Sequence, residues 1–339
     1  MEIKKISIIV PVYNGVSVIS DCLSSINNCD IGIPYELIVV DDGSTDGTGD
    51  VVKSFSCEYI RIDKAGVAKA RNTGIKKSTG DILLFFDADV KVKKDTVSKF
   101  LQHFSEDDDA YVIQGRWDKD SYAPSFSTQF LLLKYLYNYE GNLSDSKRWA
   151  GADLASGCLG IRKEVFDNVG GFDENYKWAG GEEHEFGLRL SKKYKVYYYR
   201  DIFVEHTYPN IYQISKRIYF RTVNFSMLVF APENKDLLNA HKTSVPNHDK
   251  NGIILIMLIL LSVLISFINF MLGTLLFWSL SFLYMFNIRG LLKYLVKEKG
   301  YVFAFKGAIS HFLIMIPRLM GVVKAAILYY IFGKKDYKI

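Results

Sequence analysis

A strand that runs directly into two acids is the clearest structural signal in this 339-residue sequence, and it reads DILLFFDADV, residues 81–90. The five apolar residues at 82–86 do not alternate with polar ones, a pattern typical of a strand buried on both faces of a parallel sheet. Asp87 and Asp89 follow with only Ala88 between them. Two carboxylates this close repel and raise each other's pKa unless a cation lies between them. The segment therefore calls for a metal ion, an Arg or Lys partner, or open solvent.

The same strand-then-polar-turn pattern recurs through the first 104 residues. Apolar runs at 6–12, 36–40, 59–62 and 81–90 alternate with segments of helical spacing at 16–29, 46–55 and 65–80. This order predicts an α/β fold with a mostly parallel central sheet flanked by helices. Ligands of such sheets bind at the carboxyl ends of the strands. Asp41, Asp42, Asp87 and Asp89 all follow strands, so we expect them to converge on one crevice.

The remainder of the chain suggests three further regions. Residues 105–230 are less regular and are predicted to form the second half of a domain spanning 1–230, with 1–104 as its nucleotide-binding half. A linker is expected at 231–251. From 252 to 288 the chain has no charged residue, about twice the ~20 apolar residues that cross a bilayer. Asn269 and Gly273 near the middle of this run predict a tight helical hairpin in the membrane, against the alternative of a hairpin buried in a soluble core.

The last region, 289–339, is basic and amphipathic. It holds ten Lys and Arg against two acids, whereas the whole chain has a net charge of +5. A basic tail beside an apolar run favours an anionic membrane surface over nucleic acid. Residues 302–333 are interrupted by charges and by Pro317, so we interpret them as interfacial or re-entrant helices. Basic residues on both sides of the hairpin indicate an even number of crossings with both ends in the cytoplasm.

The cysteines and the N-terminus also favour the cytoplasm for the first domain. Four cysteines, at positions 22, 29, 57 and 158, have neither CxxC nor metal-ligand spacing and suggest buried thiols in a reducing compartment. The apolar run that ends at Pro11 is too short for a signal-peptide core. We therefore expect a cell-membrane protein whose catalytic domain faces the cytoplasm.

Six motifs in a fixed order give stronger evidence about the protein family than the acidic pair alone. They are SIIVPVYN, VVDDGSTDGT, AGVAKARNTGI, STGDILLFFDADV, GGFDE and GGEEHEFGLRL, and they lie between residue 7 and residue 190. Together they resemble the family 2 nucleotide-sugar glycosyltransferases over roughly two thirds of the chain. The resemblance implies the GT-A fold. It also implies transfer of a sugar from a nucleoside-diphosphate donor, a UDP-sugar as first choice, with inversion at the anomeric carbon.

The resemblance assigns a donor site to residues at the strand ends. Those implied to bind the nucleotide sugar are Pro11, Val12, Tyr13, Asn14, Asp41, Asp42, Arg71, Asp87, Ala88 and Asp89. Mg²⁺ or Mn²⁺ is the implied cofactor, held by Asp89, Asp87 and, in some members, a histidine at the position of His206. Three alternatives stay open: Asp41 as a turn cap, Arg71 in a surface salt bridge, and His206 as an ordinary hydrogen-bonded histidine.

The acceptor side depends on the pair Glu182-Glu183. Inversion needs one general base, and the family has Glu-Asp where this chain has these two residues. Glu183 aligns with the family's base but is one methylene longer, and Glu182 is the fallback. A solvated helix start is the structural alternative for the pair. Trp178, just ahead, is a candidate for stacking on the acceptor, with core packing as the alternative.

These assignments favour a single-transfer enzyme that acts on a hydroxyl of a lipid-linked or cell-surface glycan. A polyprenyl-phosphate sugar synthase is the main alternative, but those enzymes typically continue the acidic motif as D-L-Q-x-P-P, where this chain reads DADVKVKKD. A phosphate acceptor also needs no base, yet the base position here is acidic. Processive synthases normally have more membrane helices. A non-catalytic membrane scaffold remains a further possibility, whereas a nicotinamide-dependent oxidoreductase is disfavoured because no G-x-G-x-x-G follows the first strand.

Overall fold

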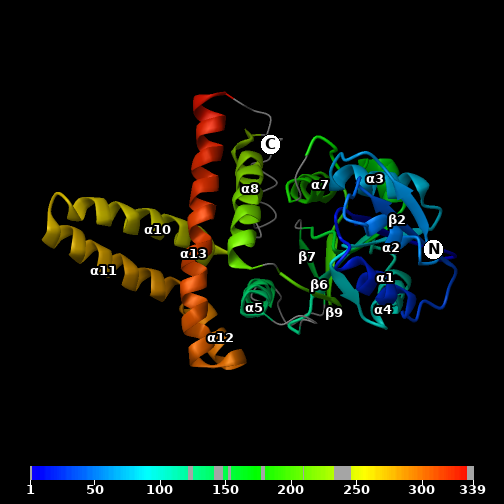
Figure 1. The fold of residues 1–339 in the computed structure, drawn as a ribbon, viewed down its shortest axis with the longest axis horizontal. Coiled ribbons are helices and arrows are strands. Elements are labelled where there is room, and N and C mark those ends of the chain that lie inside the picture. The colour runs from blue at the N-terminus through cyan, green and yellow to red at the C-terminus, as the bar shows by residue number, and fades with distance from the viewer. Residues whose placement is uncertain are drawn as a thin grey trace.

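The structure is a computed structural model that describes residues 2–120, 125–140, 148–151, 154–176, 180–208, 210–232 and 246–333. For residues 139–140 and 148–151 only the course of the backbone is described. Within these ranges the chain forms a sheet domain and a set of long helices at its C-terminal end (Figure 1).

A nine-stranded mixed sheet forms the centre of the first domain, with the strand order β3-β2-β1-β4-β8-β6-β9-β5 and β7 paired to β9. The strands are β1 Ile6–Val12, β2 Tyr35–Asp41, β3 Glu58–Arg61, β4 Ile82–Phe86, β5 Val90–Val92, β6 Val112–Trp117, β7 Arg148–Gly151, β8 Cys158–Arg162 and β9 Val196–His206. The first four are mutually parallel, and β8 then joins β4 in the antiparallel sense. The predicted α/β class with a mostly parallel centre is confirmed.

Helices cover both faces of this sheet because its central strands are apolar on both sides. Every residue of β1 and β4 is buried. One face packs against α1 (Ile19–Asn27), α2 (Thr48–Val52) and α4 (Thr96–Glu106). The other face packs against α3 (Val67–Lys77), α6 (Glu164–Val169) and α7 (Glu182–Ser191). The predicted strand 81–90 ends earlier than expected, at Phe86, so that Asp87 to Asp89 form a turn between β4 and β5.

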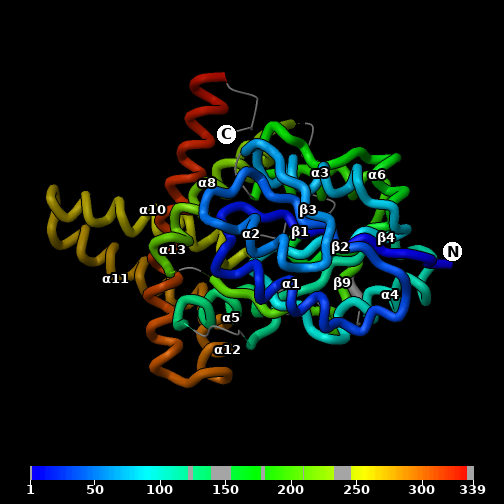
Figure 2. Tube along the Cα trace, turned by 45° about the vertical axis from the view of Figure 1, so that its right-hand side comes forward, coloured from blue at the N-terminus to red at the C-terminus, as the bar shows by residue number. Residues whose placement is uncertain are grey.

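The C-terminal helices project from one side of the sheet domain. They are α8 Ile211–Phe230, α10 Asn247–Ser266, α11 Phe270–Asn287, α12 Arg289–Lys299 and α13 Tyr301–Ala326, which continues as the π-helical segment η2, Ile327–Ile331. The earlier helix α5, Phe126–Glu140, belongs to the sheet domain and packs against α12 and α13. In Figure 1 the hairpin of α10 and α11 points away from the sheet, α13 runs across its base, and α8 lies between α13 and the sheet domain. Figure 2 shows the same crossing from a second direction.

The predicted hairpin is present, and its turn lies at residues 267–269. A Cβ on Gly273 would lie 2.3 Å from the backbone nitrogen of Ser266, so the close contact of the two helices at this point requires glycine. α10 begins at Asn247, so the end of the expected linker 231–251 is helical; residues 233–245 lie outside the described ranges. By length and composition three segments are apolar enough to cross a membrane: 247–266, 270–287 and 301–331.

One partly buried carboxylate links several segments at the edge of the parallel sheet. Glu36 on β2 accepts hydrogen bonds from Lys5 Nζ at 2.8 Å and from the Thr79 backbone nitrogen at 2.6 Å, and a third from the Ser7 hydroxyl. Partial burial raises the pKa of Glu36, but the hydrogen bonds from Lys5, Ser7 and Thr79 outweigh it and lower the pKa to about 2.

We expect Glu36→Gln to destabilise the protein at neutral pH by on the order of 2 kcal/mol, because the ionised form of this carboxylate is bound more tightly in the folded state than in the unfolded one. Since the folded pKa lies below the unfolded one, this contribution is full above about pH 4.5 and is lost as pH falls towards 2. Urea unfolding followed by circular dichroism at pH 7, 4 and 3 should therefore give a difference from wild type that shrinks with pH. Glu58→Gln, at an exposed position on β3, is the control. A difference independent of pH would contradict the assignment.

Candidate active site

The carboxyl ends of three neighbouring parallel strands bring the predicted donor residues to one edge of the sheet. β1 lies between β2 and β4, with Val12 paired to Asp41 and Ile9 to Phe85. The loop after β1 also approaches the turn after β4, since a Cβ on Gly15 would lie 4.0 Å from that of Ala88. The segments 11–14, 41–42 and 87–89 therefore open on the same side, as the strand order in the sequence predicted.

The residues after β1 and β2 are held by internal hydrogen bonds. Pro11 and Val12 are buried, whereas Tyr13 is 43% exposed and Asn14 has a left-handed backbone with φ of 47°. The Asn14 side chain accepts from Thr45 N at 2.9 Å, which joins the two loops. Of these four residues, Tyr13 and Asn14 present the most surface to a ligand.

Both predicted acids after β2 are already engaged by the protein. Asp41 accepts from Ser44 N at 2.8 Å and from the Tyr59 hydroxyl at 2.7 Å. Burial raises its pKa, but these hydrogen bonds together with Arg61 outweigh that effect and lower it. Asp42 accepts from the backbone nitrogens of Ala65 at 2.7 Å and Gly66 at 3.0 Å, immediately before α3. Asp42 therefore fixes the start of the helix that carries Arg71, and a nucleotide would have to share both carboxylates.

Arg71 is the residue that joins the two halves of the site. Its side chain is 3% exposed, and its guanidinium contacts Asp87 Oδ1 and Glu182 Oε1, each at 3.0 Å, and Glu183 Oε1 at 3.7 Å. Among the described residues its Nε has no hydrogen-bond partner. The repulsion of the acidic motif is thus relieved in part by an arginine. The sequence predicted Arg71 to face a diphosphate and did not predict this bridge to the acids at the start of α7.

The two glutamates at the start of α7 lie in different surroundings. Glu182 is fully buried and accepts from the backbone nitrogens of Gly180 at 2.6 Å and Gly181 at 3.0 Å. Glu183 accepts from Ser156 through Oε1, while its Oε2 lies 3.4 Å from the half-exposed Arg221 of α8. Every acceptor oxygen of Glu182 is therefore used by the protein fold, whereas Glu183 turns one oxygen towards an exposed side chain.

These surroundings separate the proton affinities of the acids. Burial, and then repulsion by Glu183, raise the pKa of Glu182. Burial also raises the pKa of Glu183, but Arg71, Arg221 and the Ser156 hydrogen bonds outweigh it and lower the pKa overall. Burial together with Asp89 and Glu183 raises the pKa of Asp87 to about 6 despite Arg71. The network therefore holds Glu183 ionised and leaves Asp87 the acid most in need of further positive charge.

His206 reaches the acidic turn through a strand pairing. β5 runs antiparallel to β9, and Val90 is paired with His206, so the imidazole lies beside the turn that precedes β5. Its Nε2 is 3.7 Å from Asp89 Oδ1, and Trp117 stacks on its ring with centroids 4.6 Å apart. Burial lowers the pKa of His206, more than Asp89 raises it, so the ring is neutral at physiological pH.

Not every predicted site residue can be placed, and the structure adds others. Trp178 lies outside the described residues. The sequence analysis missed Ser156, which donates hydrogen bonds to Glu183. It also missed Arg221, which contacts the same carboxylate although it lies 38 positions later in the sequence. It also missed Trp117, which supports His206. No local pattern marks any of these three residues, because each acts through a contact between distant segments.

Comparison with known proteins agrees with this architecture. The family model described as "Glycosyl transferase family 2" matches residues 7–170, and one described as "N-terminal domain of galactosyltransferase" matches residues 145–213. Residues 7–170 belong to glycosyl transferase family 2. The GT-A fold is that of mannosyltransferase PcManGT from Pyrobaculum calidifontis, solved with GDP-Man and Mn²⁺, which matches 96% of this chain and 87% of that chain with a TM-score of 0.59 and 16% identity.

Two curated relatives carry different names although both are similar to this chain. Glycosyltransferase AglE of Haloferax volcanii is 31% identical over 53% of this chain and 59% of its own length. Dolichol-phosphate mannosyltransferase of Pyrococcus furiosus is 28% identical over 49% of this chain and 48% of its own. In each case the matched part is less than two thirds of the relative's length.

We expect Arg71→Met to destabilise the sheet domain by about 3–5 kcal/mol, because it leaves buried carboxylates without their shared counter-ion. Urea unfolding of the full chain in detergent measures the loss. Arg200→Met, at an exposed position of β9, is the matched control. A loss below about 1 kcal/mol, the range of a surface ion pair, would show that the bridge is not needed for folding.

Proposed function

We propose that this protein is a membrane-associated inverting glycosyltransferase that moves one sugar from a nucleoside-diphosphate sugar to a hydroxyl of a lipid-linked or cell-surface glycan. The observation that carries the proposal is the arrangement around Arg71, which contacts Asp87 at the donor end and Glu182 and Glu183 at the other. A donor-end carboxylate and a candidate base are thereby held on the same guanidinium, which supports a reaction centre between them.

The side chains of Asp87, Asp89 and His206 would hold the divalent cation. The two carboxylates suit Mg²⁺ or Mn²⁺, which prefer oxygen ligands, and the imidazole of His206 would be the less typical third ligand. The 3.7 Å between His206 Nε2 and Asp89 Oδ1 fits a pair of ligands, since two ligand atoms each about 2.1 Å from one ion lie roughly 3–4 Å apart. Asp87 is directed to Arg71 and would have to turn towards the ion to complete the set. A bound cation would supply positive charge to the diphosphate leaving group. The Mn²⁺ and GDP-Man of the similar mannosyltransferase structure support this choice of cofactor and donor class.

Glu183 is the general base in this proposal, and Glu182 positions Arg71. The Oε2 atom of Glu183 would take the proton of the acceptor hydroxyl while that oxygen bonds to the anomeric carbon. The bond from this carbon to the diphosphate breaks, and its electron pair leaves with the nucleoside diphosphate. Glu182 is less suited to the role because backbone nitrogens and Arg71 occupy its oxygens.

Membrane association is proposed from the exposed side chains of the hairpin. Phe267 and Ile268 at its turn are 86% and 91% exposed, and Met271 is 82% exposed, far above what a water-facing turn would carry. We place the sheet domain, 1–230, in the cytoplasm as the catalytic unit, with 231–251 as the connection and the region from 252 onward at the membrane.

One observation favours the alternative acceptor, a polyprenyl phosphate. The side chain of Arg221 is 52% exposed and lies beside Glu183, where it could receive a phosphate group. A phosphate acceptor is already ionised and would not depend on a base. The two functions therefore differ in their need for Glu183.

A thermal-shift series on the full chain in detergent tests the donor site. With UDP-, GDP- and CDP-sugars, each with and without Mn²⁺, we expect one nucleotide to raise the midpoint, and only with metal, because ligand that binds the folded state stabilises it by mass action. Asp89→Asn should remove the metal-dependent part. Asp50→Asn, whose side chain is 88% exposed on α2, is the control. No shift with any nucleotide in a folded protein would count against a donor site and favour the non-catalytic scaffold.

Replacement of the base tests the acceptor class. We expect Glu183→Gln to lower the rate of sugar transfer to a hydroxyl acceptor by roughly 10²–10⁴-fold while the metal-dependent thermal shift persists. Glu185→Gln is the matched control, since Glu185 lies on the same helix and pairs with Arg189. Transfer to a polyprenyl phosphate that survives Glu183→Gln would instead support the alternative acceptor.

A further inference from the structure

The C-terminal helices cannot all cross one bilayer, because α13 runs across the base of the α10–α11 hairpin (Figures 1 and 2). If the hairpin follows the membrane normal, α13 lies in the membrane plane, and if α13 follows the normal, the hairpin lies in the plane. All three helices are long and apolar enough to span. Length and composition therefore do not distinguish the two arrangements.

The neighbour of α13 excludes the arrangement in which α13 spans. Helix α8 packs along α13, where a Cβ on Gly321 would lie 2.9 Å from the carbonyl oxygen of Tyr219. On α8 the side chains of Lys216, Arg217 and Arg221 are exposed. A spanning α13 would carry these three charges towards the hydrocarbon, where each costs several kcal/mol. An α13 that lies flat keeps α8 and the sheet domain in water.

The exposed surface of α13 has the pattern of an interfacial helix. Its exposed apolar residues follow one stripe with helical spacing: Val302, Phe305, Ile309, Leu313, Met320 and Val323. The exposed Lys306 and Lys324 each follow a stripe residue by four positions, so they lie along its edge, where long basic side chains reach the headgroups. The exposed Lys293, Lys297 and Lys299 of α12 add positive charge next to the start of α13, which suits anionic lipids.

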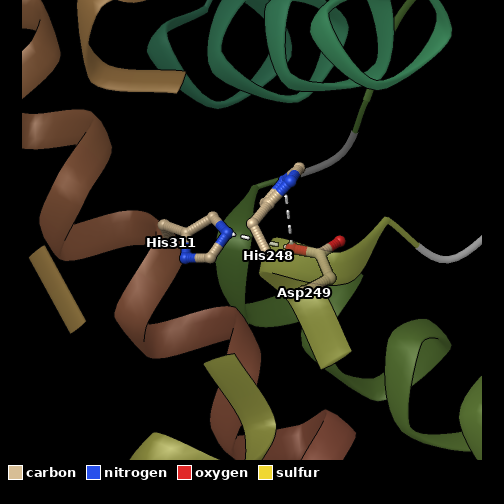
Figure 3. Close-up of side chains that lie close together, drawn as sticks. All are labelled: His248, Asp249 and His311. Carbon is tan, nitrogen blue, oxygen red and sulfur yellow. Dashed lines mark hydrogen bonds and ion pairs between the residues drawn. The ribbon is translucent and has the colours of Figure 1, made fainter. Parts of the chain in front are cut away.

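A buried ionic cluster at the crossing fixes the direction of the hairpin. Asp249, near the start of α10, is 1% exposed and accepts from Lys134 of α5 at 2.7 Å and from Arg318 of α13 at 2.6 Å. His311 of α13 lies 3.0 Å from its other oxygen (Figure 3). One carboxylate therefore joins the hairpin, the crossing helix and the sheet-domain side.

This cluster is poorly suited to a metal ion, although His248, Asp249 and His311 lie close enough together to hold one. Two cations, Lys134 and Arg318, already neutralise the single carboxylate. Both nitrogens of His311 are also engaged, since the Tyr284 hydroxyl lies 2.6 Å from Nδ1. A divalent ion would add charge to a site with excess positive charge, so the cluster is a structural junction.

The hairpin is too short to cross a bilayer from this junction. α10 passes α13 between Gly252, where a Cβ would lie 3.6 Å from Met315 Sδ, and Ile256, which is fully buried. The twelve steps from Ile256 to Ile268 at the turn rise only about 18 Å, against a hydrocarbon thickness of roughly 30 Å. Even with α13 sunk by about 5–10 Å, the turn stays within the far leaflet.

The chemistry of the turn agrees with a position inside the hydrocarbon. Phe267, Ile268, Phe270 and Met271 are all at least 73% exposed, and no charge lies between 252 and 288. Asn269 caps α11 because its side-chain oxygen accepts from Leu272 N at 3.0 Å, so this oxygen is used within the turn. Such internal pairing is what a turn surrounded by acyl chains requires.

We propose that the α10–α11 hairpin is re-entrant: it enters the bilayer from the domain side and ends in the far leaflet without crossing, while α13 lies in the near interface. The inference rests on the membrane association proposed above and replaces the two full crossings expected from the sequence. The occupant of the exposed apolar surface is the acyl region of a bilayer that contains anionic lipids.

Cysteine accessibility in proteoliposomes of phosphatidylethanolamine and phosphatidylglycerol tests the proposal on the full chain. In a background with Cys29→Ser and Cys57→Ser, single cysteines replace Ile268 at the turn and, as the matched control, the exposed Asn251 at the base. An impermeant maleimide is supplied outside the vesicles or enclosed in them. We expect the Ile268→Cys variant to react at least roughly tenfold more slowly than Asn251→Cys from either side, and to react fully in detergent.

Reaction of Ile268→Cys from the side opposite to Asn251→Cys would overturn the proposal, because the turn would then have crossed. In the same vesicles Lys299→Cys and Lys324→Cys should react from one side, whereas reaction from opposite sides would mean that α13 spans. Flotation separates these outcomes from failure of the membrane proposal itself: a protein that does not float with the vesicles is not membrane-bound, whatever its labelling.

Discussion

The buried guanidinium of Arg71 is the interaction on which the rest of the site depends. Four carboxylates, from the turn after β4 and from the start of α7, lie within one small region, and their mutual repulsion would separate them in the absence of positive charge. Arg71 contacts three of them, Asp87, Glu182 and Glu183. Its own position depends on α3, whose first turn is held by Asp42. Asp42 after β2 therefore helps to position Arg71, and through it Asp87 after β4, by holding the start of α3.

This arrangement gives each carboxylate a different state although the side chains are alike. Glu182 is saturated by backbone nitrogens and Arg71, Glu183 is held ionised by Ser156 and two arginines, and Asp87 retains a raised pKa. In such a site the ionised Glu183 can accept a proton, and Asp87 can bind a cation. In the proposed reaction those are the roles of base and metal ligand, and neither depends on the identity of the sugar.

The sequence predicted the site residues that lie at the carboxyl ends of the parallel strands. Apolar runs without alternation predicted β1, β2 and β4, and parallel strands place their carboxyl ends together, so the convergence of the segments at 11–14, 41–42 and 87–89 could be foreseen. Contacts between distant segments could not. The approach of Ser156 and Arg221 to Glu183 depends on how β8 and α8 pack, and the place of His206 beside Asp89 depends on the β5–β9 pairing, for which a three-residue strand gives little signal.

The same limit applies to the membrane region, because the sequence gives the length and polarity of each helix but not the orientation of one helix relative to another. The apolar run at 252–288 predicted a hairpin, and the charges in 302–333 indicated a helix at the interface, but only the crossing of α10 and α13 relates the two. The position of α13 also bears on the candidate base, Glu183. Helix α8 packs on α13 along one side and presents Arg221 to Glu183 on the other. If α13 lies in the bilayer surface as proposed, one helix, α8, separates that surface from Glu183, so the candidate base lies on the membrane side of the sheet domain.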